Sequence, residues 1–475
     1  MARRFIDRRI EQRSLAQAWA SGRAELVVVH GRRRVGKTEL LARFAAGRPV
    51  AFFVAAQQQP LNQLTDLGRA LGPMATGFRR GRPPQLALRD WDEALAIVAE
   101  AATERRVGLV LDEFPYLCDA DPTLPSIIQR WWDATGSHRN LVLVLSGSEQ
   151  AMIRRLTSAE GALYGRPTRS LWLRPFDYFQ AGRFVARWSP EDRVRAYAVA
   201  GGIPDYLDEF DTDRSLRDEI LRLAFSPDGR LFREAPDLLR SEFVEPRTYQ
   251  SILRALASGE HQPSRIADLA GMRSASSASP YLERLIDLEL VERQTLPTEV
   301  TAPRPRISRY AIADPYLRFY FALVDPWRSA ILLGQGAKAL DEIWPVAFDE
   351  HVSRVFEDVA GQYVRRLSGA GALPPLQAVG KQWLRAGDLD VVGVDGGKTA
   401  VAGSVKWRRA LVKLGDLADL RRDVAGMERT AAPTLMLFSR SGFDAALRSE
   451  PGLRLVTPVD LFRADLDYER VDASP

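Results

Sequence analysis

The sequence predicts an α/β protein whose N-terminal third is built on a parallel β-sheet. Three apolar runs rich in valine and leucine, at 25–29, 107–111 and 141–145, predict buried strands. A glycine-rich loop follows the first run, and an amphipathic helix is expected at 39–44. Strands that alternate with helical patterns are typical of a parallel sheet covered by helices.

The glycine-rich loop has the P-loop pattern G-x-x-x-x-G-K-[ST]. In this pattern backbone N–H groups surround phosphates, the lysine reaches the β- and γ-oxygens, and the hydroxyl ligates Mg²⁺. Lys37 is the only lysine before Lys338 in a chain with 66 lysines and arginines, and a compact ammonium suits the position better than a planar guanidinium. We therefore predict a site for ATP and Mg²⁺ at Gly31, Arg32, Arg33, Arg34, Val35, Gly36, Lys37, Thr38 and Glu39.

The second and third apolar runs end in polar residues. Asp112 and Glu113 follow the second run in the form of a Walker B strand, so Asp112 is predicted to bind Mg²⁺ with Thr38 and Glu113 to polarise the attacking water. The third run ends at Ser146 and Ser148. Because ligands collect at the carboxyl edge of open α/β sheets, both serines are candidate γ-phosphate sensors. A role in forming the turn is the alternative.

Several segments together resemble the archaeal-type ATPase family, a branch of the AAA+-related, STAND-type P-loop NTPases. Besides the P-loop they are Phe5-Ile6-Asp7-Arg8, Leu111-Asp112-Glu113-Phe114-Pro115 and Leu163-Tyr164-Gly165-Arg166. The family's G-x-P element matches Gly202-Ile203-Pro204, and the resemblance places Gly202 and Pro204 in a small helical lid near the adenine.

The resemblance also implies a catalytic role for Arg166. A fixed guanidinium stabilises charge on a transferring phosphoryl group, either in its own subunit or in a neighbour. An ordinary surface arginine is the alternative. The predicted catalytic residues are thus Lys37, Glu113 and Arg166.

The region 241–312 predicts a winged helix-turn-helix. Helices are expected at 246–257, 264–270 and 276–288, followed by a hairpin with strands near 291–293 and 309–312. Such a fold places its third helix in the major groove of DNA, while the wing contacts phosphates, here through Arg304, Arg306 and Arg309. Because the third helix is poor in base-reading side chains, packing against the ATPase is the alternative.

The segment 312–320 resembles the linker that joins the winged helix to a C-terminal domain in the same family. The resemblance implies a domain similar to PD-(D/E)XK nucleases, which hold Mg²⁺ with a helical glutamate, a strand aspartate and an E-x-K pair. The matching residues are Glu357, Asp390, Ser404 and Lys406. Since Ser404 stands where the second strand carboxylate belongs, we predict a degenerate site that does not cut DNA. It could still bind DNA through Lys381, Arg385, Lys406, Arg408 and Arg409. A strand at 435–438 and a helix from Phe443 complete this domain.

The expected fold is therefore α/β, with four parts: a P-loop ATPase core (1–180), a helical lid (181–240), a winged helix-turn-helix (241–312), and a linker with the nuclease-like domain (313–475). The length of 475 residues fits about three domains. The single cysteine suits a reducing cytosol, and no apolar stretch reaches the ~18 residues of a membrane span. We expect a cytoplasmic protein with no membrane partner.

These features predict a Mg²⁺-dependent ATP-binding and ATP-hydrolysing switch protein that is coupled to DNA through its C-terminal domains. The expected partners are ATP, double-stranded DNA, and a protein partner or a second copy of the chain. The net charge of +5 permits DNA contact without requiring it. The alternatives are an ATP-regulated, metal-dependent DNase and an interaction protein in which nucleotide is a structural plug.

Overall fold

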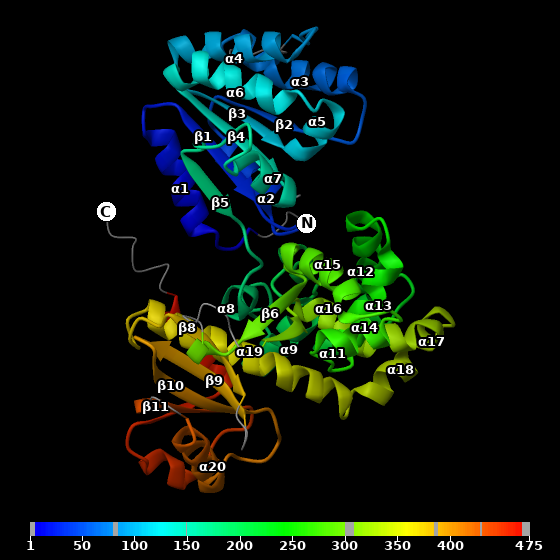
Figure 1. Cartoon of the computed structure of the whole chain (residues 1–475), viewed down its shortest axis with the longest axis vertical. Helices are drawn as coiled ribbons and strands as arrows, with labels where there is room; N and C mark the ends of the chain where they lie inside the picture. The colour runs from blue at the N-terminus through cyan, green and yellow to red at the C-terminus, as the bar shows by residue number, and fades with distance from the viewer. Residues whose placement is uncertain are drawn as a thin grey trace. The chain divides into compact units, whose positions relative to one another are not determined.

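The computed structural model describes residues 5–78, 84–148, 150–299, 308–383, 388–427 and 430–467. The chain divides into two compact units, Phe5–Pro175 and Phe176–Pro475 (Figure 1). Within the described residues, no helix combines the length and the apolar character needed to cross a membrane.

The first unit is built on a five-stranded sheet in the order β2-β3-β4-β1-β5, in which all neighbouring strands are parallel. This confirms the predicted α/β fold with a parallel-sheet core. Its strands are β1 (Glu25–His30), β2 (Val50–Val54), β3 (Val107–Asp112), β4 (Leu141–Gly147) and β5 (Arg169–Trp172). Its helices are α1 (Arg9–Ala20), α2 (Lys37–Ala45), α3 (Pro60–Ala75), α4 (Trp91–Glu104), α5 (Phe114–Ala120), α6 (Leu124–Ala134) and α7 (Gln150–Thr157).

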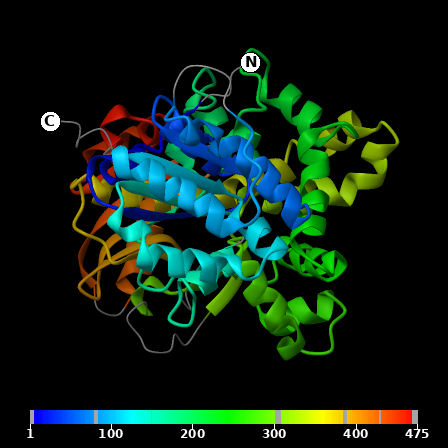
Figure 2. The ribbon, with the colours of Figure 1, turned by 90° about the horizontal axis from the view of Figure 1, so that it is seen from above.

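Helices cover both faces of this sheet, which explains why its central strands are uniformly apolar. Every residue of β3 and β4 is buried. Leucines of β3 and β4 pack with α3, α4 and α6 on one face, while α1 and α2 lie on the other face (Figure 1). Figure 2 shows the blue and cyan helices of the first face lying across the sheet. Strands that are buried on both sides cannot show polar alternation, so the continuous apolar runs are the expected pattern.

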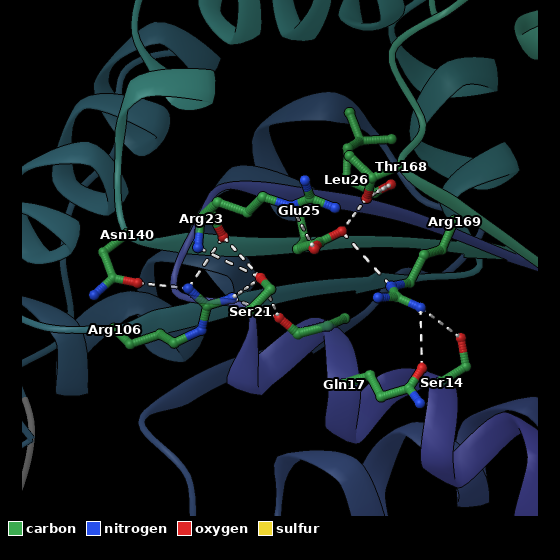
Figure 3. Close-up of polar contacts among 11 residues, drawn as sticks. Ser14, Gln17, Ser21, Arg23, Glu25, Leu26, Arg106, Asn140, Thr168 and Arg169 are labelled. Carbon is green, nitrogen blue, oxygen red and sulfur yellow. Dashed lines mark hydrogen bonds and ion pairs between the residues drawn. The ribbon is translucent and has the colours of Figure 1, made fainter.

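A buried carboxylate ties the amino edge of this sheet to α1 (Figure 3). Glu25 is fully buried and accepts hydrogen bonds from Thr168 and from Arg23 Nε at 3.3 Å. Nearby, Arg106 donates to the Ala18 carbonyl at 2.6 Å, at the end of α1. Burial raises the pKa of Glu25, but hydrogen bonds from Thr168, Ser21 and Arg23 outweigh it and bring the pKa below its ordinary value.

The second unit begins with helices and a two-stranded hairpin. The helices are α8 (Tyr178–Ala181), α9 (Pro190–Ala200), α10 (Pro204–Leu207), α11 (Leu216–Ala224), α12 (Arg230–Glu242), α13 (Pro246–Ala257), α14 (Pro263–Leu269) and α15 (Ala275–Asp287). The antiparallel hairpin joins β6 (Val291–Thr295) to β7 (Ser308–Ile312). Further helices follow at α16 (Pro315–Phe319), α17 (Arg328–Leu332), α18 (Gly336–Ile343) and α19 (Ala347–Gly369), with a π-helical turn at Tyr320–Val324.

The second unit ends in a mixed five-stranded sheet of order β12-β11-β10-β9-β8. The strands are β8 (Ala378–Trp383), β9 (Asp388–Asp395), β10 (Lys398–Lys406), β11 (Thr430–Ser439) and β12 (Leu453–Val456). Strand β9 pairs with both β8 and β10 in antiparallel fashion. Strand β11 pairs with both β10 and β12 in parallel fashion. The helices α20 (Leu414–Ala425) and α21 (Pro458–Leu461) complete the chain's regular elements.

Two helices pack against this sheet. Tyr363 of α19 meets Phe438 edge to face at 5.8 Å, while leucines of α20 join a separate apolar cluster with Val392 and Val394. The helix predicted from Phe443 is wrong. Phe443 forms a parallel bridge with Val412, and only a short 3₁₀ turn, Ala445–Ser449, follows. Asp444 begins that turn by accepting from Ala446 N–H, which is a turn contact rather than the start of a longer helix.

We predict that Glu25→Gln lowers the free energy of unfolding by about 1.5–3 kcal/mol at pH 7, because buried hydrogen bonds to a charged group are lost. The folded-state pKa of Glu25 is depressed, so this stabilisation is complete above the ordinary pKa of 4.5 and disappears as the pH falls through the folded-state value. Urea unfolding at several pH values measures the effect.

Glu39→Gln is the matched control, because Glu39 forms a half-exposed helical ion pair with Arg43. Such a pair contributes only about 0.3–0.5 kcal/mol. Equal losses in the two variants would show that the Glu25 cluster does not hold the amino edge together.

Candidate active site

The P-loop connects β1 to α2 and requires glycine where the backbone approaches β5. A Cβ on Gly31 would lie 2.2 Å from the Leu173 carbonyl oxygen, and its φ is +153°. Arg34 and Gly36 have φ values of +67° and +92°. Left-handed residues placed among ordinary ones turn successive N–H groups to the same side, which forms a concave binding surface for anions.

Lys37 begins α2 and lies folded over this loop. Only 5% of it is exposed. Its Nζ donates hydrogen bonds to the carbonyls of Gly31, at 2.9 Å, and of Arg32, at 3.1 Å. The ammonium is thus already positioned at the loop, where it can exchange carbonyl oxygens for phosphate oxygens.

Asp112, Thr38 and Ser146 come together at the carboxyl edge of the sheet. The register pairs Leu111 with Leu145 and Ser146 with Val29, so the ends of β1, β3 and β4 lie side by side. Thr38 Oγ1 donates to Asp112 Oδ2 at 2.6 Å. Asp112 and Ser146 are fully buried, and neither Asp112 Oδ1 nor Ser146 Oγ has a hydrogen-bond partner within the described residues. Buried polar atoms are normally satisfied, so these two oxygens fit a bound cation and phosphate.

Glu113 lies next to this cluster in a constrained backbone conformation. Its φ is +52°, a left-handed value that non-glycine residues seldom adopt. Its Oε2 accepts hydrogen bonds from Ser148 Oγ at 2.7 Å and from Ser148 N at 3.3 Å. The structure therefore brings Ser148 to the Glu113 carboxylate.

Two residues of this unit were not assigned a role from the sequence. Arg8 is 6% exposed, and its Nη2 donates to the carbonyls of Val35 at 2.9 Å and Arg174 at 2.7 Å, which braces the P-loop. His30 ends β1 and stacks on Trp172, and burial, with the charges of Arg154 and Lys37, lowers its pKa. The sequence could have pointed to Arg8, because it belongs to the segment 5–8 that resembles the family. For His30 the only sequence feature was its place directly before the P-loop.

Arg166 does not lie near the P-loop of its own chain. Arg166 precedes β5. Two residues further on, the Thr168 N–H donates a hydrogen bond to the Leu26 carbonyl near the start of β1. The P-loop follows the other end of β1, about 20 Å away at 3.3 Å per residue. Arg166 forms a bidentate pair with Asp133 at 2.8 and 2.7 Å. Arg166 is thus held by Asp133 toward the amino edge of the sheet, and its catalytic role, in its own subunit or on a neighbour, stays a prediction.

Gly202 and Pro204 belong to the second unit, where packing explains the glycine. A Cβ on Gly202 would lie 1.7 Å from the Phe176 carbonyl oxygen, and Phe176 N–H donates to Gly202 O at 2.7 Å. Pro204 begins α10. Their predicted place near the adenine stays a prediction.

The residues matched to the nuclease pattern come together only in part. Asp390 Oδ2 accepts from Val405 N at 2.7 Å and Ser404 Oγ at 3.3 Å. Burial raises the pKa of Asp390 above its ordinary value, while the Val405 N–H and Lys406 oppose this. Glu357 instead pairs with Lys381. No cluster of three or more acidic, histidine or cysteine side chains suited to a metal occurs in the described ranges, so these residues do not fit the Mg²⁺ set.

The residues predicted to contact DNA are only partly described. Arg304, Arg306 and Arg385 lie outside the described residues. Arg309 lies over the Trp383 ring at 4.4 Å. The solvent side of α15 presents Glu283 and Asp287, which carry the wrong charge for a phosphate backbone.

Comparisons with known proteins agree with the parallel sheet and its loop. A family model described as an ATPase domain predominantly from Archaea matches residues 5–210. A second model, described as Archaea bacterial proteins of unknown function, matches residues 320–417. A Walker-type ATPase of Pyrococcus abyssi shares the fold with a TM-score of 0.50 and 23% identity, covering 67% of this chain and 96% of that one.

Two relatives come from Methanocaldococcus jannaschii. An uncharacterized ATP-binding protein is 37% identical over 46 residues, which cover 10% of this chain and 78% of that protein. An uncharacterized protein is 30% identical over 425 residues, which cover 88% of this chain and 91% of the relative. The chain therefore belongs to the archaeal-type ATPase family.

Proposed function

We propose that the protein is a Mg²⁺-dependent switch that binds and hydrolyses ATP. The observation that carries this proposal is the cluster at the carboxyl edge of the sheet, where a buried aspartate keeps one oxygen without a described partner beside a buried lysine and a phosphate-binding loop. A buried carboxylate with an unused oxygen costs stability unless a ligand compensates it.

The chain's own residues divide the binding of Mg²⁺·ATP among them. The loop N–H groups from Gly31 to Lys37 and the Lys37 ammonium hold the phosphates, and Thr38 and Asp112 hold the ion. When bound, Mg²⁺ neutralises charge on the β- and γ-phosphates. Ser146, with its buried hydroxyl, is suited to contact the terminal phosphate.

Glu113 is the residue proposed to orient and polarise the attacking water. Ser148 holds its carboxylate in the structure, so Ser148 is a positioning residue for Glu113 rather than a direct phosphate sensor. The same contact favours a second candidate function. If Ser148 keeps Glu113 from the water, nucleotide is bound without turnover and acts as a structural plug.

The first test compares wild type with Glu113→Gln in a steady-state ATPase assay. We expect kcat to fall about 10²–10⁴-fold, as for loss of a general base, while ATP binding persists. Glu100→Gln, an exposed change on α4, should leave kcat unchanged. A wild-type rate no higher than that of Glu113→Gln would support the structural plug and reject hydrolysis.

The second test isolates the Mg²⁺ site. Asp112→Asn should weaken binding of a fluorescent ATP analogue by about 10- to 100-fold in Mg²⁺, as for other changes around metal sites, and have little effect in EDTA. Asp92→Asn on the exposed side of α4 is the control. An equal loss in Mg²⁺ and in EDTA would place Asp112 outside the ion's coordination.

We further propose that the second unit couples the nucleotide state to double-stranded DNA. The order of three helices, α13 to α15, followed by the β6–β7 hairpin supports a winged helix, and hairpin cations are suited to phosphates. Because Glu283 and Asp287 would repel phosphates, α15 is the less suitable element, and the proposed DNA contacts are phosphate contacts made by the hairpin.

Duplex DNA should therefore bind with an affinity that falls steeply between 50 and 200 mM salt, by about 10³-fold for six phosphate contacts. Fluorescence anisotropy with ATP and with ADP measures both affinity and coupling. Arg309→Glu should weaken binding, while Arg130→Glu, an exposed change on α6 of the first unit, serves as the control. Binding that ignores salt would exclude DNA as the partner.

A further inference from the structure

A charged cavity lies within the second unit, apart from the nucleotide site. Its volume is about 300 Å³, and it is lined by β6, α16, α19, β8 and β9. The charged side chains that matter here are Arg318, Glu357, Asp358, Lys381 and Asp390. They include two of the four residues matched to the nuclease pattern, Glu357 and Asp390.

Lys381 occupies the centre of the charge pattern. Its Nζ lies 2.7 Å from Glu357 Oε2 and 3.5 Å from Asp358 Oδ1. The Arg318 guanidinium donates a hydrogen bond to the other oxygen of Asp358, with Nη1 2.7 Å from Oδ2. Only about a quarter of each of the Lys381, Glu357 and Asp358 side chains is exposed, at 25%, 24% and 26%. One ammonium therefore bridges two adjacent carboxylates of α19, all three side chains being about three-quarters buried.

The acids of this cavity need a nearby cation. Burial raises the pKa of Glu357, and Lys381 opposes that effect. Burial lowers the pKa of Lys381 itself, but Asp358 and Glu357 raise it more. Removing one partner of such a buried pair leaves an uncompensated charge, which is strongly destabilising.

Asp390 completes the cavity through different contacts. Its Oδ2 is already bonded to the Val405 N–H and the Ser404 hydroxyl. A divalent ion bound here would have to displace Lys381 from Glu357 and compete for Asp390. Hard divalent cations need several oxygen ligands at once, and the described side chains present no such set.

We propose that the Lys381 ammonium is the resident counter-ion of this cavity and excludes divalent cations from Glu357 and Asp390. The cavity is then an ion-pair site at which Glu357 and Asp390 support no metal-dependent chemistry. This inference is independent of the proposed ATPase activity.

The test uses the full chain with Asp112→Asn, which removes the nucleotide-site ligand for the ion. Mn²⁺ binding is measured by electron paramagnetic resonance, and the melting temperature is measured with and without MnCl₂. Adding Glu357→Gln to this background protein should not change the amount of Mn²⁺ that it binds. Lys381→Met removes the ammonium but keeps a side chain of similar length, and it should lower the melting temperature. It should also raise the affinity for Mn²⁺ by at least about tenfold, which is the scale on which groups around a metal site change its affinity.

Matched variants identify the site. Lys398→Met changes an exposed lysine in the same sheet and should leave the Mn²⁺ affinity and the melting temperature unchanged. Adding Glu357→Gln to Lys381→Met should abolish the gained Mn²⁺ response. Lys381→Gln keeps a hydrogen-bond donor toward Glu357 and replaces Lys381→Met if that variant does not fold.

Two outcomes overturn the proposal. One is Mn²⁺ binding by the background protein that depends on Glu357 or Asp390. The other is a folded Lys381→Met or Lys381→Gln variant whose Mn²⁺ affinity equals that of the background protein. Neither outcome bears on ATP turnover, which is measured separately with Asp112 intact.

Discussion

The structure of the nucleotide site depends on the burial of Asp112 at the end of a strand that is itself buried on both faces. A carboxylate in that position must be compensated, because removing its charge from water is costly. The sheet order places β4 between β1 and β3, so the loop after β1 and the tip of β3 share one edge. Thr38 donates a hydrogen bond to one oxygen of Asp112, while the other oxygen has no hydrogen-bond partner among the described residues. Arg8 and the glycine at 31 serve the same edge, since they fix the loop that brings Thr38 there.

The second unit also compensates carboxylates that are partly removed from water, but it does so with cations of its own chain. Its partly buried acids are paired with cations of the same chain, because Lys381 and Arg318 contact Glu357 and Asp358 directly. A carboxylate with an unused oxygen is a ligand-binding arrangement, whereas a carboxylate bridged by an ammonium is a closed one. The two units thus differ in how their carboxylates are compensated, since Asp112 of the first unit keeps an oxygen without a described partner and the acids of the second unit are paired with cations of the chain.

The sequence predicted what depends on local patterns. The three central strands, the P-loop and the acidic tip could be located because buried parallel strands are continuously apolar and the loop has a fixed spacing. Contacts between distant segments could not be predicted. Nothing in the sequence indicated that Arg166 pairs with Asp133, which lies 33 residues earlier, or that Lys381 pairs with Glu357 of α19. Phe443 was assigned to a helix because an apolar residue after a turn suits either a helix or a bridge.

Ser404 explains why a lysine can suffice in place of a metal. Around the cavity of the second unit, the charges of described residues that act on one another's pKa values are those of four acids and four cations, namely Glu292, Glu357, Asp358 and Asp390 with Arg318, Arg365, Lys381 and Lys406. This local set is balanced without an ion. A carboxylate at 404 would add a negative charge beside Asp390, and two adjacent buried carboxylates would require a further cation. The serine hydroxyl instead donates a hydrogen bond to Asp390. The serine at 404 and the pairing of Lys381 with Glu357 thus contribute to a single charge balance.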